Sequence, residues 1–190
     1  MTRPCLAVFA LLALAACHKP AEPALAQGPL VLPASVAADL LRPCARPAAD
    51  PADDQWTPPA ATIAALEKAL PGAVEAAARA AAVRLPAERS FATLPEGWMR
   101  QYVGVIRDGR KLVAGNFVAL GQERAVLEMI ADRHPTGDPQ AVPEHEPIFA
   151  CDGGPANFGV EFDPATATFT AIAFDRPGPR RLSPYAYDVR

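Results

Sequence analysis

The most regular alternation of apolar and polar positions lies between residues 100 and 120. Residues 100–107 (RQYVGVIR) and 110–120 (RKLVAGNFVAL) read as two strands, and Asp108-Gly109 separates them. Asp-Gly between two such runs is typical of a hairpin closed by a type I′ turn. A two-residue loop also fixes the register of the strands. The predicted pairs include Val105 with Leu112, Val103 with Ala114, and Gln101 with Asn116.

A second hairpin is predicted closer to the C-terminal end. Residues 157–162 (NFGVEF) and 167–174 (ATFTAIAF) flank Asp163-Pro164-Ala165-Thr166, whose first two residues favour a type I turn. Pairing Phe162 with Ala167 would gather one set of apolar side chains on a single face: Phe158, Val160, Phe162, Phe169, Ala171 and Ala173. Residues 148–151 are a further, short strand candidate.

Helical periodicity comes before the strands. Ser35 is expected to cap a short helix that ends before Pro43, and Thr57 is expected to cap a longer one. The inward face of the longer helix repeats at i, i+3 and i+7, as Ile63, Leu66 and Leu70. Pro71 should break or kink it, so we expect two helical pieces rather than one.

These elements predict an α+β fold, with N-terminal helices packed on one side of a curved antiparallel sheet of about four to five strands. The pattern at 122–133 fits a helix or a strand, and we favour a helix. One domain is expected over residues 29–176, followed by a C-terminal tail at 177–190. Residues 17–28 are mostly alanine, proline and polar residues, and we interpret them as a flexible tether.

Composition and charge limit the classes of function. The chain has 190 residues, with 18 basic and 21 acidic side chains and a net charge of −3. An electrostatic nucleic-acid binder needs a basic excess, so we expect no nucleic-acid partner. The length suits a single domain, and no apolar run reaches the roughly 18–20 residues of a membrane span.

The N-terminus carries the most specific motif. Arg3 precedes an unbroken apolar stretch at 6–16 (LAVFALLALAA), which has the length of a secretory signal rather than of a membrane span. The stretch ends in Leu14-Ala15-Ala16-Cys17, where small residues precede a cysteine. This sequence resembles the lipobox of bacterial lipoproteins. The resemblance implies a signal peptide at 1–16, cleavage before Cys17 and attachment of lipid to that cysteine.

The same resemblance implies a location. Two or three acyl chains on Cys17 would anchor the protein stably to a membrane, with the domain facing the periplasm of the cell envelope. An aspartate directly after the lipidated cysteine resembles the signal that retains lipoproteins in the inner membrane. This chain has His18 and Lys19 after Cys17 instead. The outer membrane is therefore favoured over the inner membrane.

Two of the four cysteines remain for the folded domain. Cys5 would leave with the signal peptide and Cys17 would carry lipid, so Cys44 and Cys151 are left. The envelope is an oxidising compartment, and an even pair there predicts a disulfide. The alternative is a nucleophilic Cys151 beside Asp152, which would need a free thiol and a nearby base.

His134 and His145 belong to one candidate metal or acid–base site. His134, Glu144, His145 and Glu146 fall in or beside the Pro-rich loop at 135–147, and such side chains can bind zinc or transfer protons. The spacing that places two ligands on one helix face is absent. A solvated polar loop is the favoured interpretation.

Three further polar residues are candidates for ligand binding. Gln101 and Asn116 face each other in the predicted hairpin and could hydrogen-bond a peptide or glycan, or could simply end the core at the rim of the sheet. Asp152 precedes Gly153-Gly154, which could form a nest for a small ion or a bulge leaving a strand. For Gln101 and Asn116, we favour a place at the rim of the sheet over ligand binding. For Asp152, we favour a bulge over an ion-binding nest.

No sequence motif indicates a reaction or a cofactor. We therefore expect a lipid-anchored envelope protein that acts as a non-enzymatic binding or assembly module, with an envelope protein or a glycan as partner. One alternative is a small envelope enzyme or metal-binding protein that uses the loop of His134, Glu144, His145 and Glu146. Another is an inhibitor that inserts the loop at 135–147 into a partner enzyme.

Overall fold

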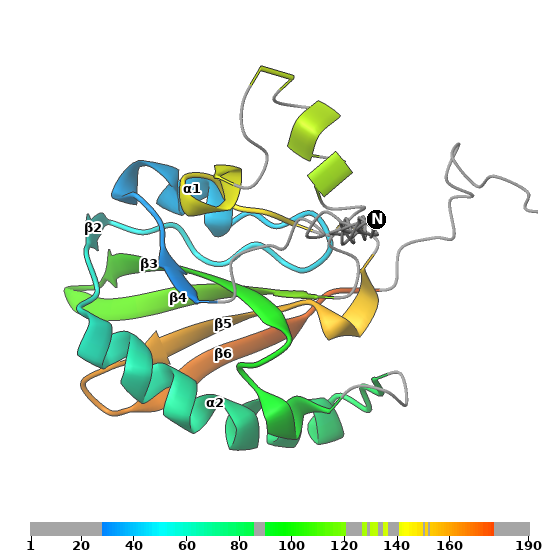
Figure 1. Cartoon of the computed structure of the whole chain (residues 1–190). Coiled ribbons are helices and arrows are strands. Elements are labelled where there is room, and N and C mark those ends of the chain that lie inside the picture. Colours follow the sequence, from blue (N-terminus) through cyan, green and yellow to red (C-terminus); the bar gives the residue numbers. More distant parts are fainter. Residues whose placement is uncertain are drawn as a thin grey trace, which may run out of the picture.

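The computed structural model describes residues 28–85, 90–120, 127–128, 130–132, 135–136, 141–149, 151 and 153–176. These residues form one mixed sheet of six strands, in the order β1-β3-β4-β5-β6, with β2 also paired to β3 (Figure 1). The predicted α+β class is confirmed. The sheet has six strands rather than four to five, and one parallel pair makes it mixed rather than antiparallel.

The central hairpin has the predicted register. β3 (Trp98–Arg107) pairs with β4 (Arg110–Ala119), and every pair expected from a two-residue loop is present, including Gln101 with Asn116. Asp108 has φ 51° and Gly109 has φ 71°, the positive values that a type I′ turn requires. The turn and the strand pairing therefore specify each other.

Two short strands share the outer edge of β3. β1 (Pro29–Val31) runs parallel to β3 beside residues 100–102, and β2 (Asp54–Trp56) runs antiparallel to it beside residues 104–106. Neither was expected from the sequence, because a three-residue run has no readable periodicity. Together they cover most of an edge that would otherwise be open.

The second hairpin is present with a different register. β5 (Phe158–Asp163) pairs with β6 (Thr168–Phe174), but Phe162 lies opposite Phe169 rather than Ala167. An irregularity beside Phe162 then shifts the pairing. Because one extra residue reverses which side chains face each side, Ile172 and Phe174 join Phe169 in the core beneath the sheet. The predicted placing of Ala171 and Ala173 on that face is wrong, and both line a hollow on the opposite side.

One continuous helix covers the lower face of the sheet in Figure 1. α2 (Ala60–Ala80) begins after Pro59 without a side-chain cap and keeps Pro71 in its interior. Both the predicted Thr57 cap and the predicted break at Pro71 are wrong. The helix buries a full stripe of apolar residues against the sheet, and this burial outweighs the local cost of the proline: Ile63, Leu66, Leu70, Val74 and Ala78.

The opposite face carries the short helix α1 (Ala37–Leu40), so the helices do not all lie on one side. A 3₁₀ turn (Ala34–Val36) leads into α1, and Ser35 lies within this turn without capping it. Leu40 and Leu41 point inward as predicted and pack on Val103 and Val105. Residues 41–53, here called the strap, then run across this face toward β2 (Figure 1).

The region between the hairpins is only partly described. Residues 127–128 and 130–132 are helical, in agreement with the favoured interpretation of this segment. Leu127, Ile130 and Ile148 form a further core cluster with Met99 and Val118. Residues 148–149 and Cys151 form no strand, contrary to the sequence-based candidate. Among the described residues, no helix is long and apolar enough to span a bilayer.

Candidate functional site

Gln101 and Asn116 lie side by side on the α1 face of the sheet. Both side chains are 0% exposed, and Asn116 Nδ2 lies 3.3 Å from Gln101 Oε1. Their placement follows from the β3–β4 register, which directs both to the face that also carries Val103 and Ala114. They stand between two apolar clusters rather than at an open rim.

Every polar atom of the two amides is engaged within the protein. Gln101 Nε2 donates to the carbonyls of Pro143 (2.8 Å) and Glu146 (2.7 Å), and its Oε1 accepts from the amide of Ile148 (2.8 Å). Asn116 Nδ2 donates to the carbonyl of Ile148 (2.7 Å). Buried amides of this kind are stabilising only when satisfied. The pair therefore fastens the loop at 143–148 to the sheet.

A buried ion pair completes this polar cluster. Arg46 of the strap donates from Nη1 to Asp175 Oδ1 (2.5 Å) and from Nη2 to Asn116 Oδ1 (2.6 Å). The two charged side chains are 5% and 2% exposed. The ring of Phe149 lies 5.8 Å from the Arg46 guanidinium carbon, within cation–π range.

Burial sets the electrostatics of this pair. It lowers the pKa of the Arg46 guanidinium, and the neighbouring Asp175 carboxylate opposes the shift. Burial likewise raises the pKa of Asp175, against the opposing effect of Arg46. Each charge is therefore retained because the other is present.

Cys44 and Cys151 form the predicted disulfide. Their Cα atoms are 5.3 Å apart, inside the expected range, and 107 positions of sequence separate them. The bond joins the strap to the segment that follows the loop at 143–148. A nucleophilic Cys151 is excluded in this state, because its sulfur is bonded to that of Cys44.

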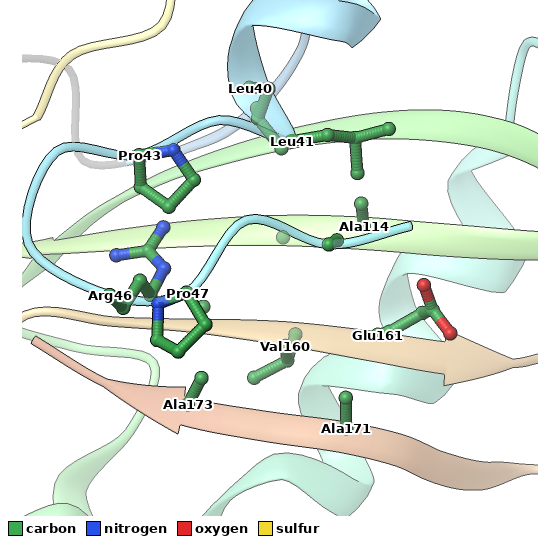
Figure 2. A pocket seen from close by; sticks show the side chains of 13 residues that line it. Leu40, Leu41, Pro43, Arg46, Pro47, Ala114, Val160, Glu161, Ala171 and Ala173 are labelled. Atoms are coloured by element: carbon green, nitrogen blue, oxygen red, sulfur yellow. The ribbon is translucent and has the colours of Figure 1, made fainter. Parts of the chain in front are cut away.

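A small hollow lies between the strap and the C-terminal hairpin (Figure 2). Its volume of about 70 Å³ is far below the few hundred Å³ of an ordinary ligand pocket. Pro43, Arg46 and Pro47 lie on one side of it, and Ala171 and Ala173 form part of its floor. This hollow suits a few water molecules or one small side chain.

A wider groove of about 520 Å³ runs between α2 and the edge strand β6. Small residues form its α2 side and residues 167–172 form the other: the α2 residues are Ala69, Ala73 and Ala77. The groove has no titratable side chain in its lining. It offers shape and apolar surface rather than catalytic groups.

A second polar cluster is buried between α2 and the sheet. Tyr102 donates from its hydroxyl to Glu67 Oε1 (2.9 Å), and Arg100 Nη1 lies 3.0 Å from the same oxygen. Burial and the Glu67 carboxylate raise the pKa of the Tyr102 phenol well above its usual value. This cluster ties the middle of α2 to β3.

The metal and acid–base candidates are not brought together in the described part of the chain. Glu144, His145 and Glu146 are exposed in a short turn at the surface. His134 and Asp152 lie outside the described residues, as does Cys17. Among the residues that the structure describes, no group of three or more His, Cys, Asp or Glu side chains is arranged to hold a metal ion.

Sequence reasoning found the Gln101–Asn116 pair and missed its charged neighbours. Arg46 lies in a Pro- and Ala-rich segment that reads as irregular, and Asp175 follows the last strand. The two are 129 positions apart in sequence. A pairing over this distance leaves no periodic signal in a single sequence.

No family model, curated protein or solved structure matches the chain.

Proposed function

We propose that this chain is a lipid-anchored protein of the bacterial cell envelope whose domain faces the periplasm. The observation that carries the proposal is the motif Leu14-Ala15-Ala16-Cys17 at the end of an 11-residue apolar stretch. The Cys44–Cys151 disulfide supports it, because such bonds persist in oxidising compartments. The absence of aspartate after Cys17 favours the outer membrane.

Within the envelope, we assign the domain a non-enzymatic role as a binding or assembly module. The small hollow beside the strap and the wider groove beside α2 are both lined mainly by alanine, glycine, proline and threonine residues. Such linings support recognition by shape rather than proton transfer or nucleophilic attack. The partner is an envelope protein or a glycan.

Metabolic labelling tests the anchor. Cells fed a palmitate analogue should label the wild-type protein, and Cys17→Ser should abolish the label and either release the domain or leave it unprocessed. Cys5→Ser is the matched control, because it removes a cysteine from the proposed signal peptide and should leave labelling unchanged. A wild-type protein that never takes up the label would refute the lipoprotein assignment.

Cross-linking in envelope membranes, followed by affinity capture of the lipidated protein, tests the binding role. We expect one protein or glycan to be retained in near-stoichiometric amount with the wild-type domain. Recovery of the protein alone, under conditions in which a known envelope complex is captured, would contradict a binding or assembly role.

A further inference from the structure

The disulfide joins two residues that are both exposed to solvent. Cys44 lies on the strap and Cys151 follows the loop at 143–148, and neither residue is buried in the core. Reduction of a disulfide requires an attacking thiolate to reach one of the two sulfurs. Exposed disulfides can therefore exchange with thiols while the protein stays folded, whereas buried disulfides become accessible to thiols only on unfolding.

The cysteine-bearing loops are also fastened without the disulfide. On the Cys44 side, Arg46 is held by Asp175 and Asn116, and the amide of Arg176 donates to the carbonyl of Ala45 at 2.9 Å. These contacts lie within two residues of the cysteine, and the Arg46–Asp175 ion pair among them is almost completely shielded from water. The strap therefore keeps its place on the sheet by non-covalent bonds of its own.

On the Cys151 side, the loop at 143–148 is held by the same pair of amides. Gln101 binds two of its carbonyls and one of its amides, and Asn116 binds the carbonyl of Ile148. All of these bonds are between 2.7 and 2.8 Å long. The segment leading to Cys151 is thus anchored only three residues before the cysteine.

Asn116 is where the two sets of contacts meet. Its oxygen accepts from Arg46 on the strap, and its nitrogen donates to Ile148 on the other loop. One fully buried amide thus connects the two loops that the disulfide connects. The covalent link and the hydrogen-bonded link act in parallel, so opening the first leaves the second in place.

We propose that Cys44–Cys151 is a thiol–disulfide exchange site that dithiols open and close in the folded protein, with Asn116 holding the two cysteines in register. A dithiol thiolate bonds to one cysteine sulfur, the Cys44–Cys151 bond breaks, and the departing sulfur takes up a proton. The second thiol of the reagent then displaces the first cysteine. Both cysteines end reduced and the dithiol ends as its own disulfide.

The chemistry defines the partner as a dithiol, whether a small molecule or an oxidoreductase with two neighbouring cysteines. It does not depend on the lipid anchor or on the binding role. Closure in the reverse direction needs an oxidised partner of the same class. The rate at which the disulfide closes depends on the effective concentration of one cysteine thiol near the other. In the reduced protein, Asn116 keeps this effective concentration high.

The kinetics of reduction by dithiothreitol test the proposal. The full chain with Cys5→Ser and Cys17→Ser retains only the two disulfide cysteines as thiols, and its reduction can be followed in mild detergent by maleimide labelling. We expect a rate that rises in proportion to the dithiothreitol concentration, with unchanged tryptophan emission. Of the two tryptophans, Trp98 is 2% exposed and donates to the carbonyl of Ala156, and Trp56 donates to the carbonyl of Leu112, so their emission reports an intact sheet and core.

Two outcomes would overturn the proposal. A rate that levels off at the unfolding rate, extrapolated to zero urea from unfolding kinetics, would show that the disulfide opens only in unfolded molecules. A red shift of the emission that accompanies the appearance of thiols would show that reduction unfolds the domain. Both can be read on the parent chain without any substitution in the polar cluster.

Re-oxidation tests the role of Asn116. After the reductant is exchanged for an oxidised dithiol, Asn116→Ala should close its disulfide about fivefold to thirtyfold more slowly, because its hydrogen bonds to Arg46 and Ile148 are both lost. Ile63→Val, which weakens packing on the α2 face, is the control and should close at the parent rate. Equal slowing in both variants would reduce Asn116 to a general effect on stability and refute its positioning role.

Discussion

Gly159 of β5 lies directly against the guanidinium of Arg46. A Cβ built on Gly159 would stand 2.6 Å from Arg46 Nε and 3.0 Å from its Cζ, closer than real side chains approach. Asn116 is the strand partner of Gly159 and also binds Arg46. The absence of a side chain at 159 is therefore what allows Arg46 to lie flat on the sheet.

Gly159→Ala should lower the free energy of unfolding by about 1–3 kcal/mol, because the added methyl group overpacks a side chain held by Asp175 and Asn116. Gly72→Ala is the control, since nothing lies within 4 Å of its Cβ position in the interior of α2. Alanine there should raise stability by about 0.5–1 kcal/mol. Urea denaturation of both variants measures the contrast, and equal losses would contradict the contact.

Gly109→Val should destabilise the protein by about 1–3 kcal/mol through backbone strain. Gly109 has φ 71° and open space around it, so lost contacts cannot explain the effect. Asp108→Asn should be nearly neutral, because asparagine tolerates the positive φ at that position. Thermal unfolding of both variants would refute a turn effect if the two losses were small and equal.

Replacing Cys44 or Cys151 alone by serine should lower the free energy of unfolding by about 2–5 kcal/mol, the usual range for a native disulfide. The bond closes a separation of 107 residues, so its removal frees a large part of the unfolded chain. Urea denaturation without reductant measures the loss. Thiol titration of the unfolded, unreduced mature protein should find no free thiol, and two reactive thiols would contradict the bond.

Arg46→Met should destabilise the protein by about 3–5 kcal/mol, since it leaves the Asp175 carboxylate buried without a counter-charge. Arg46→Met combined with Asp175→Asn should recover part of the loss, because the uncompensated charge is gone. Chemical denaturation of the single and double variants measures the coupling. A double variant less stable than the single one would show that the charge is not the cause.

The same single variant should have a characteristic pH dependence. Without Arg46, only burial acts on Asp175, and burial raises its pKa. A carboxyl group with a higher pKa in the folded state binds more protons when folded, so stability falls as pH rises through the interval between the unfolded and folded pKa values. The deficit of Arg46→Met relative to wild type should therefore shrink as the pH is lowered toward about 4. The double variant should not show this recovery.

The parts of the fold that the sequence predicted are those that short-range chemistry decides. The β3–β4 register follows from a two-residue loop, and that register placed Gln101 opposite Asn116. In the second hairpin the loop is longer and β6 carries an irregularity opposite Phe162. The loop and the irregularity each shift the pairing of β5 with β6. No local residue pattern marks the irregularity, so the predicted faces of β6 were wrong.

Long-range burial decided the rest. Pro71 costs α2 a hydrogen bond, yet the burial of five residues on both sides of it keeps α2 a single helix. Arg46 becomes part of a site only because Asp175 and Asn116, far away in sequence, meet it on the sheet. Local patterns contain neither effect.

The shared edge of β3 also sets an order of events in time. β1 and β2 precede β3 along the chain, and about seventy residues separate Pro29 from its partner Arg100. The β3–β4 hairpin closes within about 1–10 μs once both strands are available. β1 and β2 can therefore pair only after β3 is in place, so their backbone groups stay unpaired longer during folding than those of the β3–β4 hairpin.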